Sequence, residues 1–320
     1  MSRRDLESLI LLLFFVPLDA SAFLFGGISD RKAEDMLSGM SANFERGDCQ
    51  AVSEISESLF KEKPSSQIRE RAYSYLGRCY ESQGLPDKAI TVYKLANGLY
   101  PENDFFAVRL ASIYLKTGFY ATAVPLFEKA LQGRSDDIEA NAGLARCYAA
   151  QGFLSKAKLY YSRAVILGDF GDPALLKEYA AQMLRKRDWE EAALITGYAL
   201  KLSPGDAGLY EISARIAAGR GDYKNAAGQM RAALKLAPSD AGFALELALL
   251  ELLAGDYETA LGAIPAVGTE HGALALVIRG MALHKKGERA RALEYFKEAA
   301  ASGGHPFISA FAAALARGSD

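Results

Sequence analysis

Cysteine, histidine and tryptophan are scarce in this sequence, with 3 Cys, 3 His and 1 Trp among 320 residues. Three cysteines are too few for a disulfide scaffold. The histidines stand far apart, without a second ligand at helical spacing, so the sequence predicts no metal site. Only 10 prolines and no Gly-X-Y period exclude a collagen-like chain.

An excess of charge of one sign is also missing. The 37 basic and 39 acidic residues leave a formal net charge of −2, so we expect no broad nucleic-acid-binding surface. The chain has no phosphate-binding glycine loop and no G-x-S-x-G motif. We therefore predict no catalytic residue and no cofactor, and the protein is expected not to be an enzyme.

Long hydrophobic runs occur only near the N-terminus. Residues 1–22 have the features of a signal peptide: two arginines near the start, an apolar core at 9–18 (LILLLFFVPL), and small residues at Ala20 and Ala22. The core is about half as long as the ~20 residues that a membrane helix needs. The sequence thus predicts cleavage after Ala22.

Cleavage would leave a short N-terminal segment, 23–32, and a periplasmic or secreted protein. The alternative is an uncleaved signal that anchors the protein in the inner membrane through residues 9–18. In either case we expect membrane contact only through such a signal or through a partner.

What the chain does have is hydrophobic residues, which make up 50% of it, in a repeating pattern. The pattern is clearest in residues 70–103 and recurs at intervals of 34 residues as far as residue 240, with a one-residue slip at 172. In 70–103 its members are Tyr73, Leu76, Gly77, Tyr80, Gly84, Ala89, Tyr93, Ala96 and Pro101. The pattern is weaker before residue 70 and after residue 240. With these flanking segments included, the 34-residue repeat gives eight units: 33–66, 70–103, 104–137, 138–171, 173–206, 207–240, 241–272 and 273–306.

The residue types in each unit predict a pair of helices. Tyr73, Leu76 and Tyr80 have the spacing of one helix face. A small residue such as Gly77 lets two helices approach closely. Glycine at the fifteenth residue of a unit, such as Gly84 in 70–103, allows a turn with positive φ. One helix pair has too little core to fold alone, so stacked units must share a continuous core.

This pattern resembles the tetratricopeptide repeat (TPR) family, whose signature combines aromatic, Leu-Gly, Tyr, Ala and Pro positions over 34 residues. The resemblance implies an all-α fold: a right-handed α-solenoid of about eight TPR-like helical hairpins. Residues 307–317 are expected to form a C-terminal capping helix within the segment 307–320.

The expected capping helix has few polar residues. One interpretation is that its small alanines tolerate exposure. The other is a docking or dimer face, with a homo-oligomer formed through Phe307, Ile308, Phe311 and Leu315.

In the TPR family, the first helices of successive units line a concave groove. Carried onto this chain, the groove positions predict a partner-binding site of nine residues: Arg71, Arg78, Phe105, Val108, Lys116, Arg146, Lys177, Arg185 and Arg215. Arginines in a groove can bind carboxylates through paired hydrogen bonds. The alternative is that these are separate surface charges, some paired with Glu81, Glu139 or Glu211.

The three cysteines fall in different units. Cys79 and Cys147 are two units apart, which is too far for a disulfide between packed helices. Cys49 lies in the unit next to that of Cys79, so a bridge between these two stays an open alternative.

The resemblance implies a non-enzymatic scaffold or adaptor that binds a peptide segment or partner domain in its groove. A signal peptide followed by a TPR array is similar to adaptors of the bacterial cell envelope, although a fold alone does not fix a function. Alternatives are a self-associating subunit of a pilus, outer-membrane or polysaccharide-export complex and, more remotely, a glycan-binding module.

Overall fold

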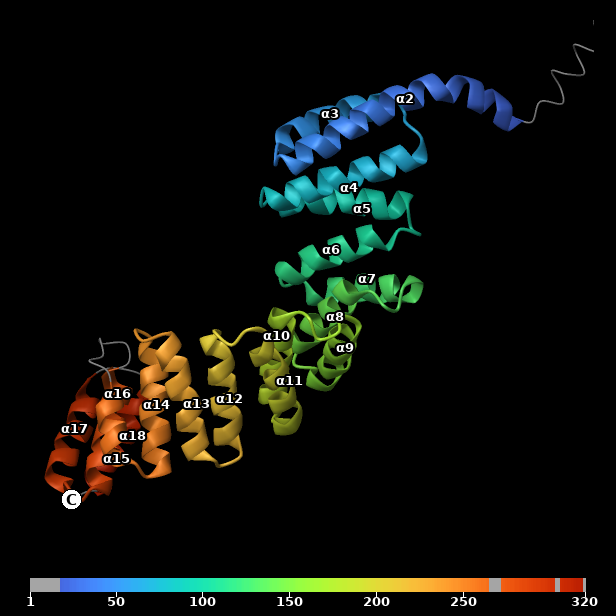
Figure 1. The fold of residues 1–320 in the computed structure, drawn as a ribbon. Helices are drawn as coiled ribbons and strands as arrows, with labels where there is room; N and C mark the ends of the chain where they lie inside the picture. Colours follow the sequence, from blue (N-terminus) through green and yellow to red (C-terminus); the bar gives the residue numbers. More distant parts are fainter. Residues whose placement is uncertain (1–17, 265–271, 303–305, 319–320) are drawn as a thin grey trace, which may run out of the picture. The chain divides into compact units, whose positions relative to one another are not determined.

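The computed structural model describes residues 18–264, 272–302 and 306–318. In these ranges the chain consists of helices joined by turns and contains no strand, which confirms the all-α prediction (Figure 1). Most of the predicted signal peptide, residues 1–17, lies outside the described residues. Helix α2 begins at Leu18 and continues through the predicted cleavage point at Ala22.

The chain divides into two compact units, 1–151 and 152–320, which are described separately here. The first contains α2 (Leu18–Glu45), α3 (Cys49–Lys61), α4 (Ser66–Ser82), α5 (Pro86–Leu99), α6 (Asp104–Lys116), α7 (Tyr120–Gly133) and α8 (Ile138–Ala150). The second contains α9 (Leu154–Leu167), α10 (Pro173–Lys186), α11 (Trp189–Leu202), α12 (Ala207–Gly219), α13 (Tyr223–Leu236), α14 (Ala241–Ala254), α15 (Tyr257–Ala263), α16 (Gly272–Lys285), α17 (Arg289–Ala301) and α18 (Pro306–Gly318).

Within each unit, every helix packs against the next one in sequence, as in a helical solenoid. Each predicted repeat contains two of these helices, and α18 follows as the predicted final helix. The frame and the helix boundaries differ most clearly at α4, whose first turn contains residues 67–69, which the repeat frame leaves between two units. The prediction missed this turn because these residues have no counterpart in the 34-residue pattern.

The turns inside the helix pairs confirm the role predicted for glycine. Gly84, Gly118 and Gly152 have φ values between 67° and 83°, a region that favours glycine. In the unit 173–206 the same position holds Arg187, whose φ of 59° is also left-handed. The backbone conformation is therefore retained even where the glycine is not.

The shared core alternates large and small side chains. Gly77 of α4 lies against the ring of Tyr93 from α5, and Gly143 of α8 lies in the same way against Phe127 from α7. Both rings are fully buried. Close contacts of this kind are possible only where one helix lacks a side chain.

A disulfide between Cys49 and Cys79 joins α3 to α4, with their α-carbons 5.2 Å apart. This resolves the alternative that the sequence leaves open. Cys147 is unpaired and fully buried, and burial raises the pKa of its thiol to about 11. It is therefore an unreactive core residue.

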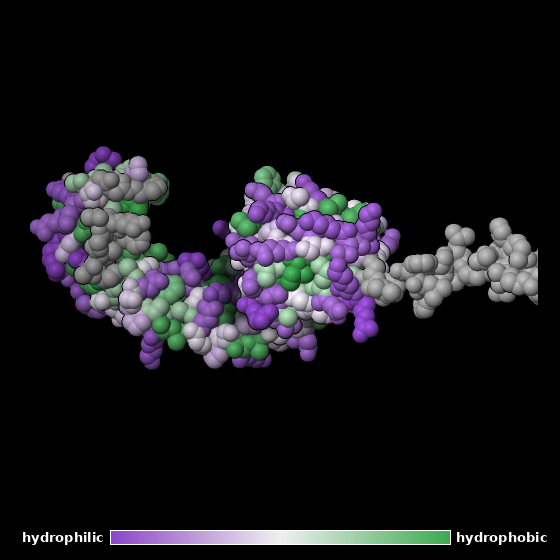
Figure 2. Space-filling model, turned by 90° about the horizontal axis from the view of Figure 1, so that it is seen from above, coloured by the Kyte–Doolittle hydropathy of each residue, from purple (hydrophilic) through white to green (hydrophobic). Residues whose placement is uncertain are grey.

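The two ends of the chain differ in surface character. The surface of the N-terminal unit seen in Figure 2 is mostly hydrophilic, and α2 contributes exposed residues such as Arg31, Glu34 and Asp35. At the other end, α18 exposes Phe307 and Phe311, whose rings are stacked 6.4 Å apart. Among the helices of the described ranges, none has both the length and the hydrophobicity to cross a bilayer.

Candidate functional site

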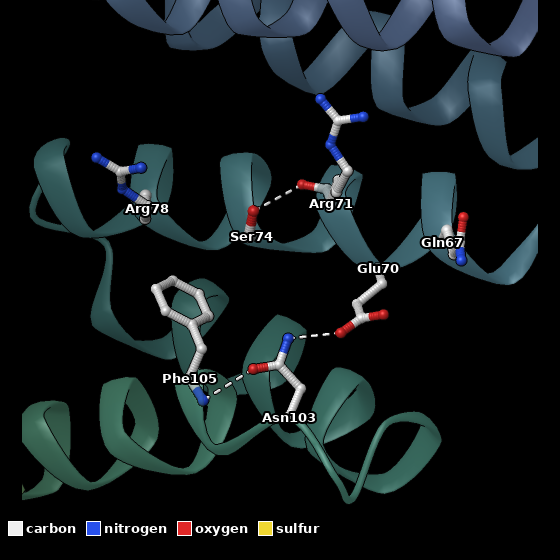
Figure 3. Close-up of a pocket in the computed structure, with 7 residues that line it drawn as sticks. All are labelled: Gln67, Glu70, Arg71, Ser74, Arg78, Asn103 and Phe105. Carbon is white, nitrogen blue, oxygen red and sulfur yellow. Dashed lines mark hydrogen bonds between the residues drawn. The ribbon is translucent and has the colours of Figure 1, made fainter. Parts of the chain in front are cut away.

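A hollow of about 420 Å³ lies between α4 and α6 in the N-terminal unit. Helices α2 and α4 pack against each other, as do α6 and α8, whereas α4 and α6 approach less closely. The hollow is lined from α4 by Gln67, Glu70, Arg71, Ser74 and Arg78, and from the start of α6 by Asn103 and Phe105 (Figure 3). Gln67, Arg71, Ser74 and Arg78 are three or four positions apart and share one helix face, whereas Glu70 points toward Asn103.

Asn103 fixes the geometry of the lower wall. Its Oδ1 accepts a hydrogen bond from the backbone N–H of Phe105 at 3.0 Å and so caps α6, while its Nδ2 donates to Oε1 of Glu70 at 2.5 Å. These bonds connect the start of α6 to α4. The ring of Phe105 packs edge-on against Phe106, with the centroids 5.4 Å apart, and remains half-exposed at the hollow.

The upper wall carries two guanidinium groups. Figure 3 shows Arg71 and Arg78 extending to the same side of α4, with Ser74 between them. The guanidinium of Arg78 lies 4.3 Å from the ring centroid of Phe44, and that of Arg71 lies 3.7 Å from a carboxylate oxygen of Glu34. Because the Arg71–Glu34 pair is exposed, its interaction is weak, and the positive charge remains accessible to a ligand.

The structure thus brings together three of the nine residues predicted from the sequence: Arg71, Arg78 and Phe105. Val108 is a correction, because only 4% of it is exposed and its side chain cannot contact a ligand. Lys116 is exposed at the end of α6, and Arg146 is half-buried on α8; neither lines the hollow.

The predicted residues of the second unit have partners within the chain. Lys177 binds Asp206 at 2.7 Å, and Arg185 donates to Oε1 of Gln182 at 2.7 Å. Arg215 pairs with Glu211 at 2.6 Å and with Glu246 at 2.9 Å. For Lys177 and Arg215 the structure therefore agrees with the alternative of paired surface charges.

A partly buried polar network, which sequence reasoning does not predict, connects the helices around the hollow. Glu81 of α4, which is 12% exposed, accepts hydrogen bonds from the hydroxyl of Tyr93 at 2.6 Å and from the guanidinium of Arg109. Arg109 also binds Glu139 of α8 at 3.1 Å. The network connects α4, α5, α6 and α8, and so supports the helices that shape the hollow.

The pKa values of Arg109 and Tyr93 are both raised within this network. Burial acts to lower the pKa of Arg109, but its hydrogen bond with Glu81 and the charges of Glu81 and Glu139 raise it above the ordinary value. Burial, and then the hydrogen bond to Glu81, raises the pKa of Tyr93. Arg109 therefore stays charged and Tyr93 stays protonated at every physiological pH, so the network is a fixed support.

The Lys177–Asp206 pair predicts a pH-dependent stability. Burial acts to raise the pKa of Asp206, but its bonds with Lys177 and with the N–H groups at the start of α12 lower it below its ordinary value of 3.8. The stabilisation is therefore present above pH 3.8 and disappears as the pH falls below it. We expect Lys177→Gln to lower the unfolding free energy by at most about 1 kcal/mol at pH 7, since the pair is partly exposed. The wild-type and variant denaturation curves should converge in acid, and a constant difference down to pH 2 would contradict this.

Comparison with known proteins gives a consistent result for the repeats. Residues 70–103, 114–166 and 213–264 each match a sequence model described as "Tetratricopeptide repeat". No curated protein sequence matches the chain. In the described residues, no group of three or more His, Cys, Asp or Glu side chains is placed to hold a metal ion.

Several solved structures share the fold at low sequence identity. A tetratricopeptide repeat protein from Parabacteroides merdae ATCC 43184 has 20% identity and a TM-score of 0.54, over 78% of this chain and 98% of that one. YrrB has 18% identity and a TM-score of 0.50, over 57% and 90% of the two chains. The pilF protein of Pseudomonas aeruginosa has 19% identity and a TM-score of 0.50, over 66% and 97%.

Proposed function

Because the chain belongs to the tetratricopeptide repeat family, whose helical arrays are protein–protein interaction scaffolds, we propose that it binds a segment of a partner protein in the hollow between α4 and α6. The observation that carries this proposal is the gathering of Arg71, Arg78 and Phe105 around one hollow. The structural relative YrrB is titled a TPR protein "with an unusual peptide-binding site", which gives a precedent for peptide binding by this fold.

The chemistry of the hollow indicates the kind of segment that it would hold. Guanidinium groups bind carboxylates through charge-assisted hydrogen bonds. The half-exposed ring of Phe105 offers an apolar contact beside them. The matching ligand is an extended segment in which acidic residues alternate with a large apolar residue.

We place this activity in the bacterial cell envelope, with the protein exported by residues 1–22. The Cys49–Cys79 disulfide supports this location, since disulfides persist in oxidising compartments such as the periplasm and are rare in the cytosol. The sequence of the apolar core at 9–18 supports it independently.

Self-association is a second candidate, which the C-terminal helix favours. Phe307 is 73% exposed and Phe311 is 41% exposed, side by side on α18. An apolar end of this kind can join two copies of the chain. Ile308 and Leu315 contribute less to such a contact, because both pack partly against the core of α16–α18.

Charge reversal in the hollow should weaken binding of acidic peptides. We expect Arg71→Glu and Arg78→Glu each to weaken binding by about tenfold or more, since charge-assisted hydrogen bonds contribute about 1.5–3 kcal/mol. The probe is an array of fluorescent peptides in which Asp or Glu flanks Phe or Leu, each paired with a version carrying Lys at the acidic positions. Affinities are measured by fluorescence anisotropy.

The matched control is Arg220→Glu, a charge reversal at an exposed arginine of the other unit. It should leave peptide affinity unchanged, and melting curves should show that all three variants are folded. Equal binding of acidic and basic peptides would contradict the proposal that the hollow binds a partner segment. Equal affinities for the wild type and the Arg78→Glu variant would contradict it as well.

A further inference from the structure

Helices α9 and α11 are the second helices of consecutive repeats in the second unit, and side chains connect them near their starts and near their ends. Near their starts, Lys158 of α9 binds Asp188 at 2.9 Å and Glu191 at 3.5 Å. Near their ends, Phe170 packs against Tyr198 of α11, with the ring centroids 4.6 Å apart. The outward faces of the two helices therefore lie next to each other.

This surface exposes large apolar side chains from both helices. Its exposed members are Leu159 and Ile166 of α9, and Leu194, Tyr198 and Leu202 of α11. With Phe170 they form what we call the α9–α11 patch. The corresponding repeat positions of α5, α7 and α17 include polar residues, among them Thr91, Gln132 and Glu294. Leucine recurs at the position of Leu202, as Leu99 of α5 and Leu236 of α13, but the repeat does not require an apolar residue at the positions of Leu159, Ile166 and Leu194.

The backbone before α10 is strained in a way that completes the patch. Asp169 and Phe170 follow each other with φ values of 48° and 55°, although neither is glycine. This turn lies two residues before position 172, where the 34-residue period slips by one residue. It places the ring of Phe170 on Tyr198. A conformation that costs free energy is therefore maintained where it adds an aromatic ring to the patch.

Positive charges are interspersed among the apolar side chains. Arg163 of α9 and Lys201 of α11 are both exposed, and α9 contains no acidic residue. The ammonium group of Lys201 lies 5.3 Å from the ring centroid of Tyr198. Lysine is depleted in protein–protein interfaces. Anionic lipid surfaces, in contrast, attract Lys and Arg and accept Leu, Ile and aromatic side chains at the headgroup boundary.

We propose that the α9–α11 patch docks the protein onto an anionic lipid bilayer. The apolar side chains would enter the headgroup region, and Arg163 and Lys201 would bind lipid phosphates. The sequence predicts membrane contact only through a signal or a partner, whereas this surface would make direct contact with the bilayer. It consists of second helices of the repeats and shares no residue with the hollow on α4 and α6.

The test is co-sedimentation of the full chain with vesicles. Vesicles with 30% phosphatidylglycerol in phosphatidylcholine should bind the protein, and pure phosphatidylcholine vesicles should bind it much less. We expect the double variant Ile166→Asp/Leu194→Asp to lower the partition coefficient by about tenfold or more, because two apolar contacts become repulsive charges. Arg163→Glu should lower it severalfold, and added salt should weaken binding of the wild type.

The matched control is Leu95→Asp, at the repeat position of Tyr198 but on α5, where the leucine is also exposed. It should bind the vesicles like the wild type. Absence of binding to phosphatidylglycerol vesicles, or an equal loss in the control, would overturn the proposal. Protein adducts from a photo-crosslinker at position 194, without vesicle binding, would assign the patch to a protein partner instead. Arg78→Glu should retain vesicle binding, so failure of the peptide site and failure of the patch can be distinguished.

Discussion

Replacing Gly77 with leucine should lower the free energy of unfolding by about 3 kcal/mol or more, through overpacking of a close helix contact. A β-carbon at this position would lie 2.2 Å from Cε1 of Tyr93. The ring cannot easily move aside, because it is fully buried and its hydroxyl is bound to Glu81. The substitution must therefore separate α4 from α5.

Gly98 provides the matched control. It lies within α5, and a β-carbon there would meet no atom within 4 Å. Gly98→Leu should be neutral or stabilising by up to about 1 kcal/mol, since glycine is a poor helix former. Urea denaturation followed by circular dichroism compares the two variants. If both shift the midpoint equally, the repeat frame and its close contacts are wrong.

Loss of the Cys49–Cys79 disulfide should have the second largest effect. The bond closes a loop with a sequence separation of 30, for which chain entropy predicts about 3–4 kcal/mol of stabilisation. We expect the double variant Cys49→Ala/Cys79→Ala to unfold at lower urea concentration, with the change concentrated in α2 and α3. Hydrogen exchange resolved by mass spectrometry would locate it.

A reductant gives the control for this prediction. Dithiothreitol should destabilise the wild type to the level of the double variant and leave the double variant unaffected. Cys147→Ala should respond to reductant like the wild type, because Cys147 forms no disulfide. An effect of reductant on the double variant would show that the disulfide is not the cause.

The repeat architecture could be predicted from sequence because its determinants are local. Helix stripes, turn glycines and small contact residues such as Gly77 recur at fixed intervals, so each confirms the others. Arg187 shows the limit of this approach. No single sequence signal identifies an arginine as the left-handed residue of a turn; only its place in the 34-residue frame does.

The candidate site was predicted only in part. Arg71, Arg78 and Phe105 could be found because the family's groove positions place them on the faces that line the hollow. The ion pairs of these charged residues could not be predicted from the groove positions, because ion pairing depends on distances between side chains of different repeats. In the alternative of paired surface charges, Glu81 would pair with one of the predicted groove arginines, but it binds Arg109, at the sixth position of the next repeat.

The most direct test of the protein-binding function is photo-crosslinking in cells, with benzoylphenylalanine placed at Ser74 inside the hollow. The controls are the same probe at Thr91, which is exposed on α5, and at Phe311 on α18. We predict one dominant envelope protein crosslinked at position 74, none at position 91, and loss of the adduct with Arg78→Glu. Absence of an adduct at position 74, together with self-adducts from position 311, would contradict the binding role of the hollow and favour the self-associating subunit.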